Sequence, residues 1–283
     1  MESLKHIKNR MKTIDTIIKA TNAMKMVSTV KLSKIGKRHD SFKESADILL
    51  DMIDIAGREA LFEQSLDPDF WLLRSSGKTL ILVLSTDQGF CGSFNQSIIE
   101  CYRQTIKAYP GAFVETFGKK CSNIPQYIAD LKTNRSIENR FNINEFSKVL
   151  ADLVFEYVVY HDVYNVIVIS GEFKNVLVQK GKTTQIFPIK NEGKSVEDQY
   201  TEVEGNKGKF IEEAFSMYLF KLFNAMVKEH IVAELSARTM AMDNSVKNAK
   251  DMFAKLSVLY NRIRQAKITQ ELTDIVSSLE CAQ

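Results

Sequence analysis

The C-terminal quarter of the chain lacks helix-breaking residues, and this constrains the fold more than any other feature of the sequence. All four prolines and eleven of the twelve glycines of the 283-residue chain lie between Gly57 and Gly208, so the segment 209–283 contains neither. At about 1.5 Å per residue, one helix of this length would span roughly 110 Å, several times the width of a small domain. The segment is therefore predicted to form one long helix, or very few, that needs another helix beside it.

Apolar residues within this segment repeat with the spacing of a coiled-coil seam. Steps of four and three residues alternate through Met242, Val246, Ala249, Phe253, Leu256, Tyr260 and Ile263. The same spacing recurs near the N-terminus, at Leu4, Ile7, Met11, Ile14 and Ile18. We therefore expect the N-terminal helix, 1–57, to pair with the C-terminal helix, 209–283, and the rest of the chain to be inserted between them.

The inserted segment, 75–190, alternates between strand-like and helix-like patterns. Strands are predicted at 79–85, 113–117 and 164–170, and helices at 93–108, 126–131 and 144–160. Two further β-prone runs, 175–180 and 184–189, predict a hairpin around Gly181, and the polar stretch 190–209 predicts a loop. The predicted fold class is α/β: a long antiparallel coiled coil of the N- and C-terminal helices with an inserted Rossmann-like open α/β sheet domain.

Charge is concentrated at the N-terminal end of the chain. The formal net charge is only +3, but residues 1–43 carry eleven Lys and Arg against three Asp and Glu, an excess of eight. This end is expected to contact an acidic partner or surface, whereas the total gives no reason to expect nucleic acid. No apolar run approaches the roughly 20 residues of a membrane-spanning helix, and no targeting segment is evident at the start.

The four cysteines have no paired short spacing, so we expect neither a zinc site nor a disulfide framework, and a reducing compartment fits best. The four histidines are scattered without metal-ligand spacing. The sequence thus offers no catalytic constellation, no metal site and no cofactor site.

The segment DQGFCGSFN at 87–95 is similar to half of the active-site signature of papain-type proteases. In that signature the nucleophilic cysteine follows three residues after the first cysteine, and this position is Phe94. A phenyl ring can neither attack a carbonyl nor give a proton to a base. His230, which lies downstream at a permissible separation, falls within the breaker-free segment and is predicted to be a solvated helix residue. The sequence therefore argues against a thiol hydrolase.

Two Gly-Lys-Thr triplets, at Gly77 and Gly181, suggest phosphate-binding loops. The motif requires another glycine five positions earlier, where this chain has Leu72 and Val176. Both triplets are therefore predicted to be turns.

The segment 86–92 follows a predicted strand and precedes a predicted helix, which is where open α/β sheets bind ligands. It lacks the Gly-x-Gly-x-x-Gly spacing, so nucleotide binding is not expected. We expect Gly89 and Gly92 to adopt backbone angles that other residues avoid, Ser93 or Asn95 to cap the helix, and Cys91 to be buried.

The two ends of the chain resemble a known family, the gamma subunits of F-type ATP synthases. The similarity rests on IKNRMKTI at 7–14 and AMKMV at 23–27 in the first helix. In the last helix it rests on MAMDN at 240–244, YNRIRQA at 260–266 and ITQELTDIV at 268–276. The middle matches through STDQGFCGSFN at 85–95, where Gln88 replaces a common Arg and Ser93 a common Gly.

The resemblance implies a central rotor shaft that couples proton flow through a membrane ring to ATP synthesis or hydrolysis at neighbouring subunits. The shaft would stand in a three-fold alternating ring of alpha and beta subunits, and would also contact the epsilon subunit and the membrane c-ring. It would have no catalytic site or cofactor of its own. Its place would be peripheral, on the cytoplasmic face of the bacterial inner membrane rather than in mitochondria.

The resemblance also implies which residues carry the coupling. Polar contacts with a loop of a beta subunit are expected from Arg264, Gln265, Thr269 and Glu271. Arg238 would support the same region, and Met24 and Lys25 would face an acidic lever of a beta subunit. Two alternatives remain: a tethering coiled-coil protein with an inserted α/β module, and an enzyme with a ligand at the turn 89–93.

Overall fold

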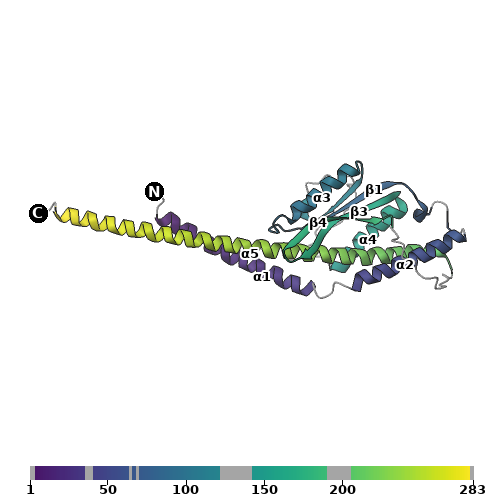
Figure 1. Ribbon diagram of the computed structural model, residues 1–283, viewed down its shortest axis with the longest axis horizontal. Helices are drawn as coiled ribbons and strands as arrows, with labels where there is room; N and C mark the ends of the chain where they lie inside the picture. The colour runs from purple at the N-terminus through teal and green to yellow at the C-terminus, as the bar shows by residue number, and fades with distance from the viewer. Residues whose placement is uncertain are drawn as a thin grey trace. The chain divides into compact units, whose positions relative to one another are not determined.

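The C-terminal segment forms one helix, α5 (Lys207–Glu280), of 74 residues, in agreement with the absence of glycine and proline beyond Gly208 (Figure 1). The computed structural model describes residues 4–35, 41–63, 66–67, 70–121, 142–189 and 205–280. These residues fall into two compact units, one formed by 1–30 with 238–283 and the other by 31–237.

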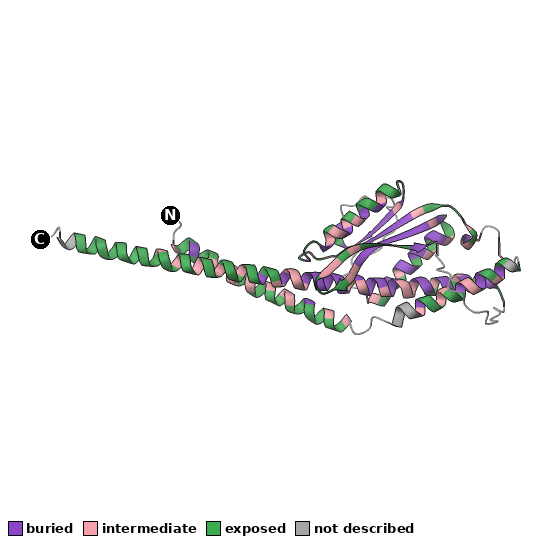
Figure 2. Ribbon diagram, in the orientation of Figure 1, coloured by how far each residue is buried: buried purple, intermediate pink, exposed green. Residues whose placement is uncertain are grey.

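The first unit is an antiparallel pair of helices, made by α1 (Leu4–Ile35) up to residue 30 and α5 from residue 238. The predicted seam is confirmed, because each of its residues is less exposed than most of its neighbours (Figure 2). On α5, Met242 and Val246 are buried and the later seam residues are half-buried. On α1, the seam continues beyond Ile18 through Thr21, Lys25 and Ser28, so its last positions are polar.

From Arg264 to residue 277, every residue of α5 is exposed. We call this stretch the overhang. Lys25 pairs with Asp243, and in an antiparallel pair of helices the residue numbers of facing positions have a nearly constant sum. Leu4, where α1 begins, therefore faces the start of the overhang, which explains why the seam ends there.

The second unit contains a four-stranded sheet with the order β2 (Phe113–Phe117), β1 (Lys78–Leu84), β3 (Val163–Asn175), β4 (Val178–Phe187). The first three strands are parallel, and β4 is antiparallel to β3. This is the open, mixed sheet that the alternation of strand and helix patterns predicts.

Both faces of the sheet are covered by helices. Successive side chains of a strand point to opposite faces, so those of β1 fall alternately into two hydrophobic clusters. Ile81 and Val83 pack with α3 (Phe94–Ala108), whereas Leu80, Leu82 and Leu84 pack with α4 (Ile143–Tyr160). The second cluster also takes in α2 (Ser41–Phe62) and the first part of α5. Each such side chain contributes roughly 1.5–3 kcal/mol by burial.

An aromatic group lies at the centre of the larger cluster. The ring of Trp71, in the short helix η2 (Trp71–Leu73), lies 4.4 Å from the ring of Phe215 on α5, and Phe187 of β4 lies 6.0 Å from Phe215. Phe215 has no exposed surface. The first part of α5 is thus a core helix of the second unit, which its unbroken pattern alone does not reveal.

The predicted turn at Gly181 is wrong. The hairpin turns at Val176 and Leu177, and Gly181 lies inside β4 opposite Gly171. Its N–H donates a 2.8 Å hydrogen bond to the Ser97 hydroxyl of α3, and a Cβ here would come within 2.8 Å of the Ser97 carbonyl oxygen. Glycine therefore serves close packing between strand and helix at this position.

The described part of segment 1–57 contains two helices, α1 and α2, on either side of residues 36–40. The helix predicted at 126–131 and most of the loop predicted at 190–209 lie outside the described residues.

Candidate functional site

The predicted coupling residues of the first unit form two groups, one in the paired part and one in the overhang. In the paired part, the Lys25 ammonium makes an ion pair with Asp243 on α5. The Lys247 ammonium lies 3.0 Å from the other oxygen of the same carboxylate. The ammonium of Lys25, and to a smaller extent that of Lys247, lowers the pKa of Asp243 to about 2. Asp243 therefore stays ionised at neutral pH between two cations.

Next to this pair, α1 presents an apolar outer face. Met24 is half-buried, whereas Met26 is 70% exposed and Val27 is 56% exposed. Exposed methionine and valine side chains beside a lysine form a surface that suits a partner with both apolar and acidic groups.

The overhang carries the second group, Arg264, Gln265, Thr269 and Glu271, all of them exposed. The Thr269 hydroxyl donates a 3.0 Å hydrogen bond to the Gln265 carbonyl, and Glu271 lies 3.7 Å from the Lys267 ammonium. Both interactions are local to the helix and exposed, so each contributes little to stability.

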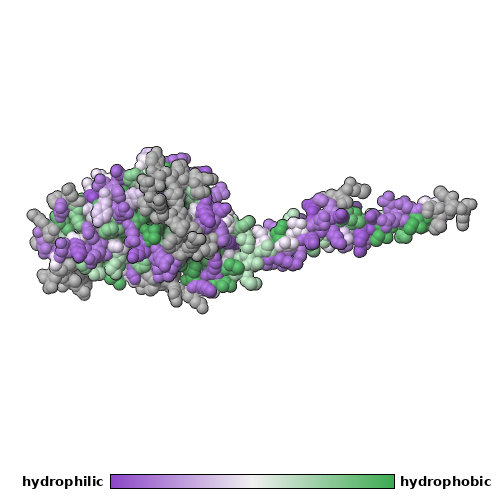
Figure 3. All heavy atoms as spheres, turned by 180° about the vertical axis from the view of Figure 1, so that it is seen from behind, coloured by the Kyte–Doolittle hydropathy of each residue, from purple (hydrophilic) through white to green (hydrophobic). Residues whose placement is uncertain are grey.

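Apolar side chains are also exposed on the overhang, at helical spacing. Figure 3 shows hydrophobic side chains beside hydrophilic ones along this part of the chain, and the large ones are Ile268, Leu272, Ile275 and Val276. Positions four, seven and eight residues apart lie on one side of a helix. The overhang therefore presents a polar group and an apolar stripe.

Arg238 differs from the other predicted residues, because its side chain is only 3% exposed. The structure therefore brings Met24 and Lys25 together and Arg264 to Glu271 together, while Arg238 lies in the interior. Asp243 was missed by the sequence analysis; it faces Lys25 only once the antiparallel register is known.

The turn between β1 and α3 is held by the side chain of Asn95, not by a helix cap. Asn95 Nδ2 donates to the Thr86 hydroxyl at 2.8 Å and to Cys91 Sγ at 3.2 Å, and Ser93 makes no side-chain cap bond. Ser93 therefore occupies the predicted N-cap position of α3 without a side-chain cap bond, and the burial of Cys91, at 3% exposed, is confirmed.

The expectation for the two glycines of this turn is half right. Gly92 has a φ of 59°, but the second left-handed residue is Phe90, with a φ of 63°, not Gly89. Phe90 is 67% exposed, so its ring lies in solvent.

The prediction of a solvated His230 is wrong. His230 is 1% exposed, and its Nδ1 accepts a 2.9 Å hydrogen bond from the N–H of Gly171 on β3. Burial lowers its pKa to about 4, and the backbone of Ser85 opposes this shift. Leu219, Phe223 and Met226 precede it at steps of four and three, so the apolar spacing itself marks His230 as a core position.

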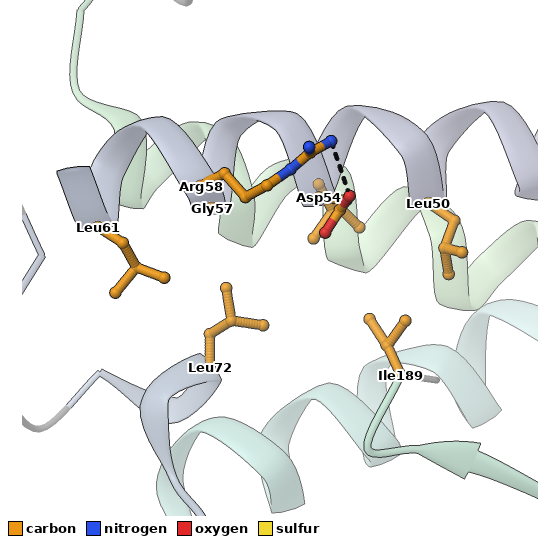
Figure 4. A pocket seen from close by; sticks show the side chains of 8 residues that line it. Leu50, Asp54, Gly57, Arg58, Leu61, Leu72 and Ile189 are labelled. Atoms are coloured by element: carbon orange, nitrogen blue, oxygen red, sulfur yellow. Dashed lines mark ion pairs between the residues drawn. The ribbon is translucent and has the colours of Figure 1, made fainter. Parts of the chain in front are cut away.

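A pocket of about 200 Å³ lies between α2, η2 and the residues after β4 (Figure 4). Leu50, Leu61, Leu72 and Ile189 point into it, and Arg58 pairs with Asp54 at 3.0 Å along one side. Within the described ranges there is no cluster of three metal-binding side chains. No helix in the described part of the chain is both long and apolar enough to cross a membrane.

Comparisons with known proteins connect both units to one family. The profile of a family described as ATP synthase matches residues 3–281. An ATP synthase gamma chain from Mycoplasmopsis pulmonis is 31% identical over 98% of this chain and 99% of its own length. One from Geobacter metallireducens is 31% identical over 99% of each chain.

Two solved structures share the fold. A chain of the central stalk and c-ring structure of the Tetrahymena thermophila mitochondrial ATP synthase has a TM-score of 0.59 at 20% identity. It covers 80% of this chain and 98% of its own. A chain of the Euglena gracilis mitochondrial ATP synthase gives 0.52 at 15% identity over 92% and 95%.

Proposed function

We propose a function from one established premise: this chain belongs to the ATP synthase gamma chain family. The function is that of the central stalk of an F1Fo ATP synthase, which rotates inside the ring of alpha and beta subunits. The match over residues 3–281 is the observation that carries the proposal, because it includes the helix pair and the sheet domain together.

The mechanism follows from the shape of the helix pair. Two helices, of which one continues alone as the overhang, have no three-fold symmetry. Such a shaft makes different contacts with each catalytic subunit of a three-fold ring and so stabilises a different conformation at each site. Rotation then passes each site through the sequence of states, and the coupling is a difference in contact energy between states.

The exposed groups of the first unit provide these contacts. Arg264, Gln265, Thr269 and Glu271 make polar contacts with a loop of a beta subunit, and the apolar stripe of the overhang packs against the ring. Arg238, being buried, acts by supporting this helix rather than by touching a partner.

Met24 and Lys25 face the acidic lever of a beta subunit. Because Lys25 is already paired with Asp243, the acidic lever would share the positive charge of Lys25 with the Asp243 carboxylate. A shared, half-exposed ion pair gives a weak contact, so steric contact by the neighbouring methionine contributes more.

The chemistry takes place in the neighbouring subunits. The position where an open α/β sheet binds a nucleotide is filled in this chain by Phe94 and His230, which supports a stalk without a catalytic site of its own. The complex is membrane-associated, and we place this chain at the cytoplasmic face of a bacterial inner membrane, in contact with the epsilon subunit and the c-ring.

The test is co-purification of the tagged full-length chain from its own cells. Alpha and beta subunits should be recovered in equal amounts, each in excess over the tagged chain, together with ATPase activity. Recovery of the chain alone, or as a self-dimer, would support the tethering coiled-coil alternative instead. Calorimetry of the isolated chain with ATP should give no binding heat; tight binding would favour an enzyme built on the sheet.

A further inference from the structure

The direction in which the chain crosses the sheet reverses between β1 and β3. We call the space just outside the carboxyl ends of these two strands the crevice. From β1 the chain crosses through α3 to β2 on one side, and β3 lies on the other side. Open α/β sheets bind their ligands in this crevice, outside the ends of the strands. In this unit the crevice lies between Ser85, the residue that follows β1, and Gly171 in β3.

A side chain of α5 occupies the crevice. The imidazole of His230 accepts the Gly171 N–H at Nδ1 and lies beside the backbone of Ser85. Its ring centre is 5.6 Å from that of Phe94, the first residue of α3. The three elements that form the crevice therefore all contact one ring.

The packing leaves no room for a larger group at this point. A Cβ on Gly171 would come within 2.7 Å of Cε2 of Phe94 and within 3.3 Å of Nδ1 of His230. The absence of a side chain on Gly171 thus allows its N–H to approach the imidazole.

The hydrogen bond also fixes the protonation state of the ring. Because Nδ1 accepts from an amide, the neutral ring carries its proton on Nε2. Nε2 is buried, and the polar group beside it is the backbone of Ser85, which lies outside ideal hydrogen-bond geometry but still favours the protonated ring. An imidazole at this position accepts the Gly171 N–H, whereas an apolar side chain of similar size would leave that buried donor unpaired.

We propose that His230 is a built-in ligand of the sheet: its imidazole takes the place of a small molecule in the crevice and fixes α5 to β1, β3 and α3 at one position. It is a positioning residue, which sets where the helix lies against the sheet without contacting any reacting group. In the proposed stalk, this attachment is one point at which force on the helix passes into the sheet.

The charged groups around the crevice are engaged elsewhere. Glu229, which precedes His230 on α5, accepts a 3.3 Å hydrogen bond from the Phe173 N–H. Glu172 and Lys182 on the β3–β4 hairpin pair with each other at 2.9 Å. The thiols of Cys91 and Cys121 belong to the same core as Phe94, and burial raises the pKa of Cys121. The ring is therefore held by its amide partner and by packing.

The experiment replaces the ring with a free molecule. His230→Ala removes the imidazole, and the isolated full-length chain is then unfolded in urea at pH 8 with and without added imidazole. If the crevice is a ligand site, imidazole at 100 times its dissociation constant lowers the unfolding equilibrium constant of the variant about 100-fold and leaves that of the unchanged chain unaltered. Pyrrole has the ring shape but no acceptor nitrogen, and should have little effect.

Two results would overturn the proposal: no stabilisation of the folded variant by imidazole, or equal stabilisation by pyrrole, which would reduce the ring to a space filler. If His230→Ala does not fold, His230→Asn takes its place, because the amide oxygen can accept from Gly171. That variant should fold and lose the stability change between pH 6.5 and 4, and an unchanged acid profile would also refute the proposal. All readouts use the isolated chain, so they stand apart from the test of the proposed function.

Discussion

Two stretches of α5 differ in burial: one is packed in a core and the other is exposed. Between residues 207 and 237, α5 is a core helix of the second unit, with Phe215, Leu219 and Phe223 fully buried. In the overhang, 264–277, the same helix has every residue exposed. Tertiary packing usually provides most of the stability of a helix, and the overhang lacks it. A helix can therefore continue where only its freedom from glycine and proline and its local side-chain pairs support it.

The largest effect on the free energy of unfolding is expected at the centre of the aromatic group. Phe215→Ala should lower the free energy of unfolding by about 3–5 kcal/mol, because it removes a fully buried ring that contacts Trp71 and Phe187 and leaves a cavity. Leu272→Ala in the overhang is the matched control on the same helix and should change it by less than about 0.5 kcal/mol. Urea unfolding of the isolated chain measures both, and similar losses would erase the distinction between the two stretches.

Acid should destabilise the second unit before the first. The pKa of His230 is lowered to about 4, so the unfolded chain takes up a proton below pH 6.5 while the folded chain does not. Stability is therefore complete above pH 6.5 and falls by roughly 3 kcal/mol as the pH decreases to 4. The pKa of Asp243 is lowered to about 2, so its contribution is lost only between about pH 4 and 2.

Unfolding curves at a series of pH values, followed by the fluorescence of the single tryptophan, Trp71, test this order for the second unit. His230→Asn is the control, since it removes the titrating group. A loss of the same size in the control between pH 6.5 and 4 would assign the effect to other groups.

A smaller effect is expected at the ion pair of the first unit. Asp243→Asn removes the common partner of Lys25 and Lys247 but leaves the apolar seam in place. The groups are partly exposed, so the loss of thermal stability should be modest and should shrink as sodium chloride is added. Val246→Ala, one turn away in the seam, should cost stability that does not depend on salt, and a salt-independent loss in Asp243→Asn would show that its charge is not what matters.

The smallest effect on stability should accompany a clear effect on function. Arg264→Ala combined with Gln265→Ala should leave the unfolding of the isolated chain unchanged, because both side chains are exposed on the overhang. In reconstituted vesicles, this double variant should reduce proton-driven ATP synthesis more than Lys25→Ala does. Equal synthesis rates for the two variants would contradict the roles proposed for these residues.

Periodicity was enough to predict the elements that depend on local pattern. The seam from Met242 to Ile263, the single C-terminal helix and the strand at 113–117 all follow from the spacing of apolar residues and from missing glycine and proline. These features need no knowledge of what lies opposite.

The errors concern residues whose role is set by a distant neighbour. Gly181 marks a close approach to Ser97 rather than a turn, and His230 is buried because Gly171 and Phe94 meet it from the sheet and from α3. The left-handed backbone at Phe90 belongs to a residue type that seldom adopts it, so no composition rule would place it there. The roles of Arg264, Gln265, Thr269 and Glu271 depend on a partner outside the chain and stay predictions.

The ion pair of Lys25 and Asp243 has a consequence for how the two helices can slide. In an apolar seam, a shift by one heptad replaces each contact with a similar one, so it changes the energy little. A shift by seven residues toward the end of α5 would place Lys25 against Lys250, and two like charges at one seam position repel. The ion pair thus fixes the register of the two helices, and with it the length of the overhang that extends beyond α1.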